Sequence, residues 1–412
     1  MIGIIKSLNS EEKLDILAGS ARYDVCLASC SGNFHGGRGR VRDPGNPISR
    51  WIYPAHIPGK GQVGILKVLQ TNACKNNCAY CHLSARNDTI KRVGFSPREL
   101  ADIFIQFVQK HRVHGLFISS GVGFNADSAM EKMIHTAEIL RNKYKFKGYI
   151  HLKILPGSSY NLMERAAQLA DRISINLEAP TKDHLRTIAP DKNFMHDLIT
   201  RLQWAGDLIR KNLYTKSHTT QFVVGASNET DLDILKTVDW IYREMFVFRA
   251  YFSAFQPFEA LTYPAVNDHT LLREHRLYQS DFLLRGYGFR LHDLVFDKNG
   301  HLPKNVDPKT AYARLHPEIF PVDINRASKE ELLKVPGIGP LSAQRIAETR
   351  GNNPFHNLAE LKQAGAVVKW AAPYIEFSGK KDKHLESGYS QPWLFDELSS
   401  TGWCSEAGSP PP

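Results

Sequence analysis

The sequence predicts an α/β protein: a partial or full barrel of alternating strands and helices, followed by a small all-α module. From about residue 61, short apolar runs typical of buried strands alternate with stretches whose apolar residues recur at helical spacing. After about residue 320 this alternation gives way to short helices around the turn PGIGP (336–340). Because six strand–helix units follow one another, we expect a parallel sheet with its chemistry at the C-terminal ends of the strands.

Each unit begins with an apolar run and continues into a helix. Ser96-Pro97-Arg98-Glu99 is a capping box with proline at the first helical position, so it predicts the start of a helix. The segment LDILKTVDWIY places its apolar residues on one helical face. The expected strands are 64–70, 115–120, 148–155, 172–178, 219–225 and 247–255.

Composition divides the chain into four parts. We expect an N-terminal extension (1–60), the barrel domain (61–320), a hairpin module (321–378) and a disordered tail (379–412). The extension carries Arg38, Arg40, Arg42 and Arg50 in a loop rich in glycine and proline. This loop is either a basic arm that contacts a polyanion or a solvated surface segment.

The net charge of +10 and the pI near 9.2 suit a polyanionic partner, and they equally suit a basic protein without one. Apolar runs stay well short of the roughly 18 residues that a membrane helix requires. The first residues also lack the pattern of a secretory signal. We therefore expect a cytoplasmic protein with no membrane partner.

Three of the six cysteines, Cys74, Cys78 and Cys81, lie within eight residues directly after the first expected strand. A structural zinc site uses four ligands, usually in two separated pairs, and a [4Fe–4S] cluster normally takes four thiolates. Three thiolates would leave one iron of such a cluster open to a substrate or a cofactor. Two alternatives remain at this stage: a zinc site, and a closed cluster in which His82 is the fourth ligand.

The spacing Cys-x3-Cys-x2-Cys, with Tyr80 before the third cysteine, resembles the signature of the radical S-adenosylmethionine (radical SAM) superfamily. The resemblance covers roughly residues 61–300. It implies a radical SAM barrel with a [4Fe–4S] cluster on Cys74, Cys78 and Cys81, and S-adenosylmethionine chelated to the open iron. It further implies reductive cleavage to a 5′-deoxyadenosyl radical, with electrons from a reductase or a flavodoxin- or ferredoxin-type donor.

The same resemblance implies positions for cofactor contacts. The turn after the second strand corresponds to a Gly-Gly-Glu-like motif whose acid is absent here, so only the backbone role of its glycines carries over. Later contacts fall at the ends of the fourth, fifth and sixth strands. The implied cofactor-binding residues are Tyr80, Gly121, Gly123, Glu178, Gly225, Tyr251 and Ser253.

Residues 323–350 resemble a helix–hairpin–helix motif, with a capping box at 328–331 and the turn PGIGP. Gly337 and Gly339 allow the backbone to approach an anion at a helix N-terminus, and Lys334 and Arg345 can add charge. Such a turn grips a phosphate without reading bases. Residues 353–370 look like a degenerate second copy. The alternative use of the hairpin is packing or protein contact.

The whole arrangement resembles the radical SAM proteins of DNA modification or repair, which are associated with a uracil-DNA glycosylase-like partner. The resemblance therefore implies a nucleic-acid substrate, DNA rather than RNA. From the residues alone only a polyanion follows. A radical SAM enzyme that modifies tRNA or other RNA, and a non-catalytic iron–sulfur sensor that binds DNA, remain alternatives.

Cys26 and Cys30 belong to the segment ARYDVCLASCSG (21–32). A buried inert thiol is one reading of each. Our hypothesis is that Cys26 is catalytic and either returns a hydrogen atom to a substrate radical or is attacked by it.

Overall fold

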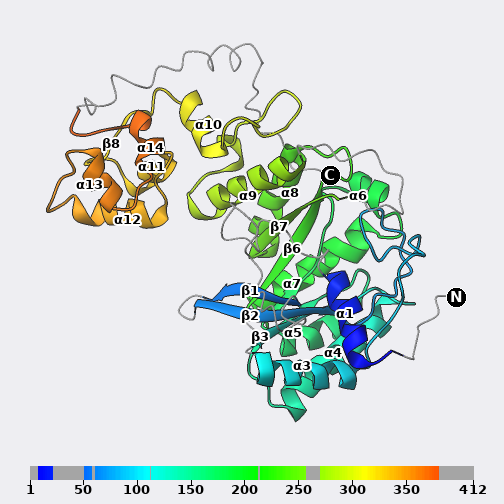
Figure 1. Ribbon diagram of the computed structural model, residues 1–412. Helices are drawn as coiled ribbons and strands as arrows, with labels where there is room; N and C mark the ends of the chain where they lie inside the picture. Colours follow the sequence, from blue (N-terminus) through cyan, green and yellow to red (C-terminus); the bar gives the residue numbers. More distant parts are fainter. Residues whose placement is uncertain are drawn as a thin grey trace. The chain divides into compact units, whose positions relative to one another are not determined.

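The computed structural model describes residues 8–21, 51–57, 61–111, 113–211, 214–256 and 270–379 (Figure 1). Cys26, Cys30, the arginine loop and residues 380–412 lie outside these ranges, so the predictions made for them stay predictions. Contacts divide the chain into two compact units. Unit 1 comprises residues 1–229 and 240–274, and unit 2 comprises residues 230–239 and 275–412.

Unit 1 contains a curled seven-stranded sheet in the order β1-β2-β3-β4-β5-β6-β7 (Figure 1). Strands β2 to β7 are parallel, as the six expected strand–helix units predict, and the half-barrel confirms the predicted fold class. Strand β1 was not predicted and pairs antiparallel with β2 at the edge. The strands are β1 (Ile52–Ile57), β2 (Gly61–Leu69), β3 (Val113–Ser119), β4 (Tyr149–Lys153), β5 (Arg172–Ser174), β6 (Ser217–Val224) and β7 (Arg249–Ala254).

Helices follow the strands in the order that a parallel sheet requires. The capping box at the start of α3 is formed, since Ser96 Oγ accepts from the Glu99 amide at 3.2 Å. The helices are α1 (Ser10–Ala21), α3 (Pro97–His111), α4 (Ala126–Glu138), α5 (Tyr160–Leu169), α6 (Lys182–Ile188), α7 (Thr200–Arg210), α8 (Asp231–Met245) and α9 (Thr270–Gly286). Two π-helical turns, η3 (Ile139–Lys143) and η4 (Phe194–Ile199), continue α4 and precede α7.

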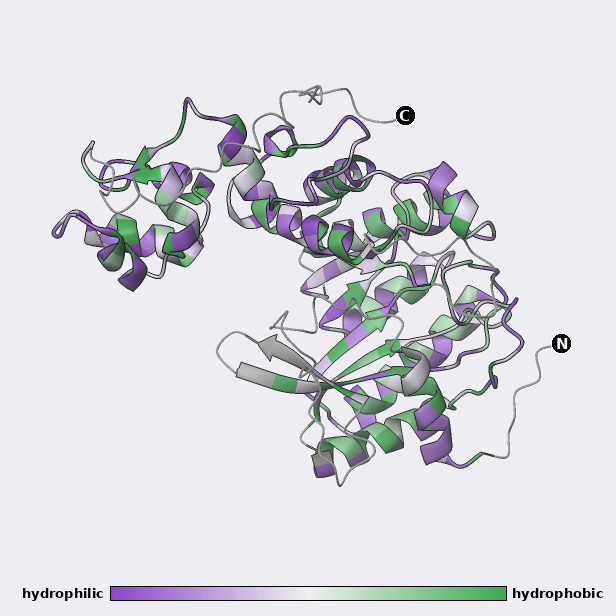
Figure 2. Ribbon diagram, turned by 45° about the horizontal axis from the view of Figure 1, so that its top comes forward, coloured by the Kyte–Doolittle hydropathy of each residue, from purple (hydrophilic) through white to green (hydrophobic). Residues whose placement is uncertain are grey.

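The two faces of the sheet differ in chemistry. Leu66, Leu116 and Ile118 on one face are fully buried. Their strand neighbours on the other face, Lys67 and Phe117, are only half-buried. In Figure 2 hydrophobic and hydrophilic residues accordingly alternate along the ribbon. The apolar face thus forms the core, while the opposite face is free to be polar.

Unit 2 contains the hairpin module, whose core includes Leu332, Ile338, Ile346 and Leu361. A parallel pair of two-residue strands, β8 (Val322–Asp323) and β9 (Ile375–Glu376), joins the two ends of this predicted all-α module. Its helices are α10 (Pro308–Leu315), α11 (Lys329–Lys334), α12 (Pro340–Thr349), α13 (Leu358–Gln363) and α14 (Val368–Ala371), with 3-10 turns η5 (Leu291–Asp293) and η6 (Ala372–Tyr374). In the described residues of both units, no helix is both long and apolar enough to cross a membrane.

Candidate functional site

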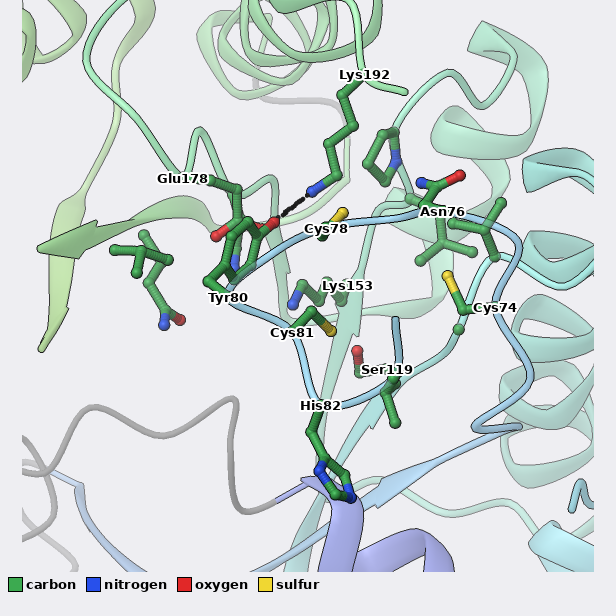
Figure 3. Close-up of a pocket in the computed structure, with 18 of the residues that line it drawn as sticks. Cys74, Asn76, Cys78, Tyr80, Cys81, His82, Ser119, Lys153, Glu178 and Lys192 are labelled. Carbon is green, nitrogen blue, oxygen red and sulfur yellow. Dashed lines mark hydrogen bonds and ion pairs between the residues drawn. The ribbon is translucent and has the colours of Figure 1, made fainter. Parts of the chain in front are cut away.

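A cavity of about 490 Å³ lies at the C-terminal ends of the parallel strands, and the three clustered cysteines line it (Figure 3). Cys74 and Cys78 are buried, and Cys81 is half-buried. The volume is within the range of small-molecule and cofactor sites. Further lining residues come from several strand ends and include Ser119, Lys153, Asn176, Gln221, Val223 and Ser253.

The loop that carries the cysteines is held by a buried arginine. Arg92 donates to the backbone oxygens of Asn72 (2.8 Å), Leu83 (2.9 Å), Ser84 (2.7 Å) and Asn87 (2.7 Å). These four bonds satisfy carbonyls that the irregular loop cannot pair in a helix or sheet. Arg92 thus fixes the loop shape, a role that sequence reasoning missed because a lone arginine in a loop usually indicates a solvated surface.

The turn after β3 packs directly against the cysteine loop. The Gly121 amide donates to Thr71 O at 2.7 Å, and the Gly123 amide donates to Ala73 O at 3.0 Å. A Cβ on Gly121 would stand 2.2 Å from Ala73 O, so glycine is required there. Gly123 also forms a β-bridge with Cys74. Both glycines therefore have a structural role in positioning the thiols.

Lys192 forms a buried network beside the cysteines (Figure 3). Its Nζ donates to Tyr80 Oη at 2.7 Å and to Glu178 Oε1 at 3.3 Å, and the side chains of Lys192 and Glu178 are each 7% exposed. Burial alone would lower the pKa of Lys192, but the negative charges of Cys78 and Glu178 outweigh burial and raise it. Burial raises the pKa of the Cys78 thiol, and Lys192 opposes that rise. The cavity thus holds a fixed positive charge next to its thiols.

The backbone before Lys192 braces the cysteine loop as well. The Ala79 amide donates to Ile188 O at 2.7 Å, and the Asn77 amide donates to Asp191 Oδ2 at 2.6 Å. No motif or spacing marks Lys192 in the sequence, because it lies 111 positions beyond Cys81 in a loop after α6. Only the fold brings it to the thiols.

The arrangement of the thiols favours a cluster over a single metal ion. Among the described residues, no three His, Cys, Asp or Glu side chains gather closely enough to hold one ion. In Figure 3 the His82 side chain extends away from the three thiols, so it does not complete a tetrahedral zinc site. Three thiols spaced around one cavity suit a cluster in which each sulfur binds a different iron. The buried charge of Lys192 would compensate part of the negative charge of such a cluster.

Four of the seven predicted cofactor-binding residues line the cavity: Tyr80, Gly121, Glu178 and Ser253. Glu178 has φ +67°, a conformation that is rare for residues other than glycine and often occurs at functional sites. The other three do not appear among the described lining residues. Gly123 bridges to Cys74, Gly225 (φ +85°) closes a turn with Glu229, and Tyr251 lies two residues before Ser253 on β7.

The two hairpin glycines differ in what the fold demands of them. Gly337 has φ +79°, and a Cβ there would lie 2.5 Å from Val367 O in the second turn. The Val367 amide also donates to Gly337 O at 2.8 Å, so the degenerate copy packs on the first. Gly339 caps α12 with φ −98°, and a Cβ there would meet only Tyr287 Oη, at 3.4 Å. Internal packing therefore requires glycine at 337 but not at 339.

The two basic residues predicted at the hairpin also differ. Lys334 Nζ donates to Tyr312 Oη at 2.9 Å and lies 3.5 Å from an Asp293 carboxylate oxygen. Its charge is thus already engaged within unit 2. Arg345 is exposed on α12 and is the better placed of the two to contact an external anion.

Comparisons with known proteins identify both regions. Residues 68–241 match the family model of the radical SAM superfamily, and residues 319–366 match that of the helix-hairpin-helix motif. No curated protein matches the chain.

Several solved structures resemble part of the chain. The FeFe-hydrogenase maturase HydG from Carboxydothermus hydrogenoformans is 16% identical with a TM-score of 0.44, and the alignment covers 54% of this chain and 52% of HydG. Methylornithine synthase (PylB) is 13% identical with a TM-score of 0.41, with 52% and 61% covered. Coproporphyrinogen III oxidase (HemN) from Escherichia coli is 13% identical with a TM-score of 0.34, with 52% of each chain covered.

The chain therefore spans about half to three fifths of the length of these structures. The family match covers the segment that contains the three cysteines, Lys192 and four of the six parallel strands, β3 to β6. Residues 68–241 are thus similar to the radical SAM superfamily, whose model they match.

Proposed function

We propose that this protein is a radical SAM enzyme, with a [4Fe–4S] cluster and S-adenosylmethionine as its cofactors. We further propose that it modifies or repairs nucleic acid, with DNA as the preferred substrate. The observation that carries the proposal is the hairpin turn at 336–340, which the same chain joins to the thiol-lined cavity. Helix–hairpin–helix turns bind phosphates through backbone amides at a helix N-terminus. A radical generator linked to such a turn suits a substrate that is a polyanion.

At the cavity, Cys74, Cys78 and Cys81 would hold the cluster, and Tyr80, Gly121, Glu178 and Ser253 would lie beside S-adenosylmethionine. Together the two cofactors supply abstraction of a hydrogen atom from the substrate. The protein contributes the fixed shape of the cysteine loop and the buried charge of Lys192. Gly123, Gly225 and Tyr251 do not line the cavity. They would support cofactor binding indirectly, by positioning the neighbouring residues that do line it.

At the hairpin, Gly339 is the residue most directly involved. The first backbone amides of α12 have no hydrogen-bond partner within the helix, so they can bind an anion. Pro340, the first residue of α12, has no amide hydrogen and therefore leaves no donor unpaired at that position. Because the chain itself does not require glycine at 339, we infer that the missing Cβ makes room for a phosphate. Arg345 adds charge at the same helix, and Lys334 supports the module from within.

The test compares Gly339→Ala and Gly339→Val with Gly351→Val in the full-length holoenzyme. Gly351 is exposed in the same module and a Cβ there would contact nothing, so it is the matched control. We expect binding to oligonucleotides to weaken from Ala to Val at 339 for all sequences alike, and to fall steeply with salt. Unchanged binding in Gly339→Val, or a loss confined to one sequence, contradicts the proposed role.

Competition between DNA and RNA of the same sequence separates the preferred substrate from the RNA alternative. The wild type should release 5′-deoxyadenosine and methionine when it is reduced with dithionite, and their absence would favour a redox sensor. Mass analysis of digested nucleosides after reaction identifies the product. The proposal also includes an electron donor of the flavodoxin or ferredoxin type and a uracil-DNA glycosylase-like partner protein. The rate of turnover that each electron donor supports is measured directly.

A further inference from the structure

Three neutral polar side chains, those of Ser119, Asn176 and Gln221, line the cavity that holds the thiols. Ser119 is 2% exposed and Asn176 is 8% exposed, while Gln221 is half-buried. Among the described residues, none of these three side chains has a hydrogen-bond partner. Because a buried polar group without a partner costs free energy, such groups around a cavity indicate a ligand that pairs with them.

Asn176 and Gln221 lie on neighbouring segments of the barrel. The chain after β5 continues alongside β6, since the Ile175 amide donates to Thr219 O at 3.0 Å. Three residues further on, the Glu178 amide donates to Gln221 O at 2.8 Å. Asn176 lies between these two bonds, so its side chain and that of Gln221 enter the cavity from adjacent segments and can bind one ligand together.

These amides lie deeper in the barrel than the groups beside the thiols. Glu178, which belongs to the network beside the thiols, comes two residues after Asn176, or roughly 7 Å along an extended chain. Ser119 is the last residue of β3, and the bridge between Cys74 and Gly123 lies four residues beyond it. The cavity therefore has a rim, which carries the thiols, and an inner end, which carries the three unpaired side chains.

Asn76 provides a contrast within the same cavity. Its side chain is 6% exposed, lines the cavity and likewise has no hydrogen-bond partner among the described residues. It lies in the cysteine loop, between Cys74 and Cys78 (Figure 3). Asn76 thus belongs to the rim, with the proposed cofactors, and the groups left for a substrate are those of the inner end.

We propose that Asn176 and Gln221 bind the hydrogen-bonding edge of a nucleobase that has left the base stack and entered the cavity. A carboxamide presents a donor and an acceptor side by side, which is how Asn and Gln recognise bases. An enzyme that acts on a base within a duplex has to take it out of the stack to reach it. The proposal rests on the proposed function, and it specifies the target as a base and not as the sugar or the phosphate of the strand.

The test uses the full-length holoenzyme and DNA duplexes that differ only at one bulged position, which carries adenine, cytosine, guanine, thymine or no base. Asn176→Leu and Gln221→Met keep the size of the side chain but remove its hydrogen-bonding groups. Gln221→Glu keeps the shape but offers only acceptors when it is ionised. Asn161→Leu and Gln168→Met, at two exposed positions of α5, are the matched controls.

The wild type should bind at least one base-bearing duplex about fivefold or more tightly than the abasic duplex, because a matched amide contact discriminates by at least that much. Asn176→Leu and Gln221→Met should bring this ratio close to one, while their affinity for S-adenosylmethionine and their iron content stay near the wild-type values. Gln221→Glu should shift the preference toward bases with an exocyclic amino group and away from thymine. The two control variants should keep the wild-type ratio.

Three results overturn the inference. The first is equal affinity of the wild type for the base-bearing and abasic duplexes, and the second is an unchanged ratio in iron-loaded Asn176→Leu and Gln221→Met. The third is a loss of S-adenosylmethionine affinity as large as the loss of the ratio, which would assign the amides to the adenine of the cofactor. If Gly339→Val weakens DNA binding while the wild type does not distinguish base from abasic site, only this inference fails. If the wild type binds no nucleic acid at all, the proposed function itself fails.

Discussion

Two buried lysines, one in each unit, show how differently the cavity region and the hairpin region are built. Lys192 has a carboxylate and a phenol as partners, at Glu178 and Tyr80. Lys309, on α10, is 8% exposed; it donates to Ile338 O at 2.5 Å and lies 4.6 Å from the centroid of the Tyr287 ring. Burial lowers the pKa of Lys309 to about 7, which Asp307 only partly offsets, whereas the pKa of Lys192 is raised.

The difference indicates two ways to support a binding site. Around the cysteines, buried charges compensate one another, so the removal of one partner leaves another charge without compensation. At the hairpin, a neutral carbonyl is the nearest partner of the lysine, and the backbone is shaped mainly by close packing of its turns. The first region should therefore be sensitive to changes of charge, and the second to added atoms.

The largest expected effect is on the cluster. Cys74→Ala, Cys78→Ala and Cys81→Ala should each abolish it, because all three thiolates are needed to hold about four irons per chain. Anaerobic reconstitution followed by iron analysis and visible absorption measures the loss. Survival of the cluster in any one of these variants would show that the thiol assignment is wrong.

Lys192→Met should be next in size, because it leaves Glu178 buried without its cation. Loss of one partner of a buried ion pair typically costs about 3–5 kcal/mol of the free energy of unfolding. The double variant Lys192→Met with Glu178→Gln should recover part of that loss, since the unpaired charge is then gone. Urea denaturation of the full-length protein measures both. A double variant less stable than Lys192→Met would contradict the compensation argument.

Gly337→Ala tests the sensitivity of the hairpin to added atoms. The new Cβ would meet Val367 O at 2.5 Å in a backbone conformation with φ +79°. We expect a loss of roughly 3 kcal/mol, while Gly339→Ala should be nearly neutral for stability. Thermal unfolding and hydrogen exchange of the Val367 amide report on the packing of the two turns. Equal stability of the two variants would remove the distinction between the glycines.

Local sequence signals anticipated much of the fold. The capping boxes at Ser96 and Ser328 form as predicted, because they depend on residues only three positions apart. The six parallel strands follow from apolar runs in the sequence. Strand β1 was missed because it is an edge strand containing Pro54 within a segment rich in loop-forming residues.

The site was predicted less completely than the fold. The spacing of the cysteines indicates their chemistry by itself. Lys192 and Arg92 depend on chain segments that meet only in three dimensions. Gly123 illustrates another limit: a glycine at a strand end has the same appearance in the sequence whether it lines a cavity or supports the neighbouring loop.

The smallest expected effect concerns Lys309 and its dependence on pH. Its pKa is about 7 in the folded protein against an ordinary value of 10.5, so between these values the unfolded chain binds more protons. The free energy of unfolding should therefore rise with pH across this range, because the cost of burying the charge disappears as the lysine loses its proton.

Lys309→Met removes this titration. The stability of the variant relative to the wild type should be greatest below pH 7 and should fall by about 2 kcal/mol between pH 6.5 and pH 9. Loss of the hydrogen bond to Ile338 O adds a constant that is independent of pH, so the difference between the two pH values isolates the charge. Urea denaturation of the full-length protein at both pH values measures it, with Lys329→Met, an exposed lysine of the same module, as the control. If the stability of Lys309→Met relative to the wild type is the same at both pH values, Lys309 keeps its proton throughout, held by the Ile338 carbonyl and the Tyr287 ring. In that case both buried lysines are charged in the folded protein, although their partners differ.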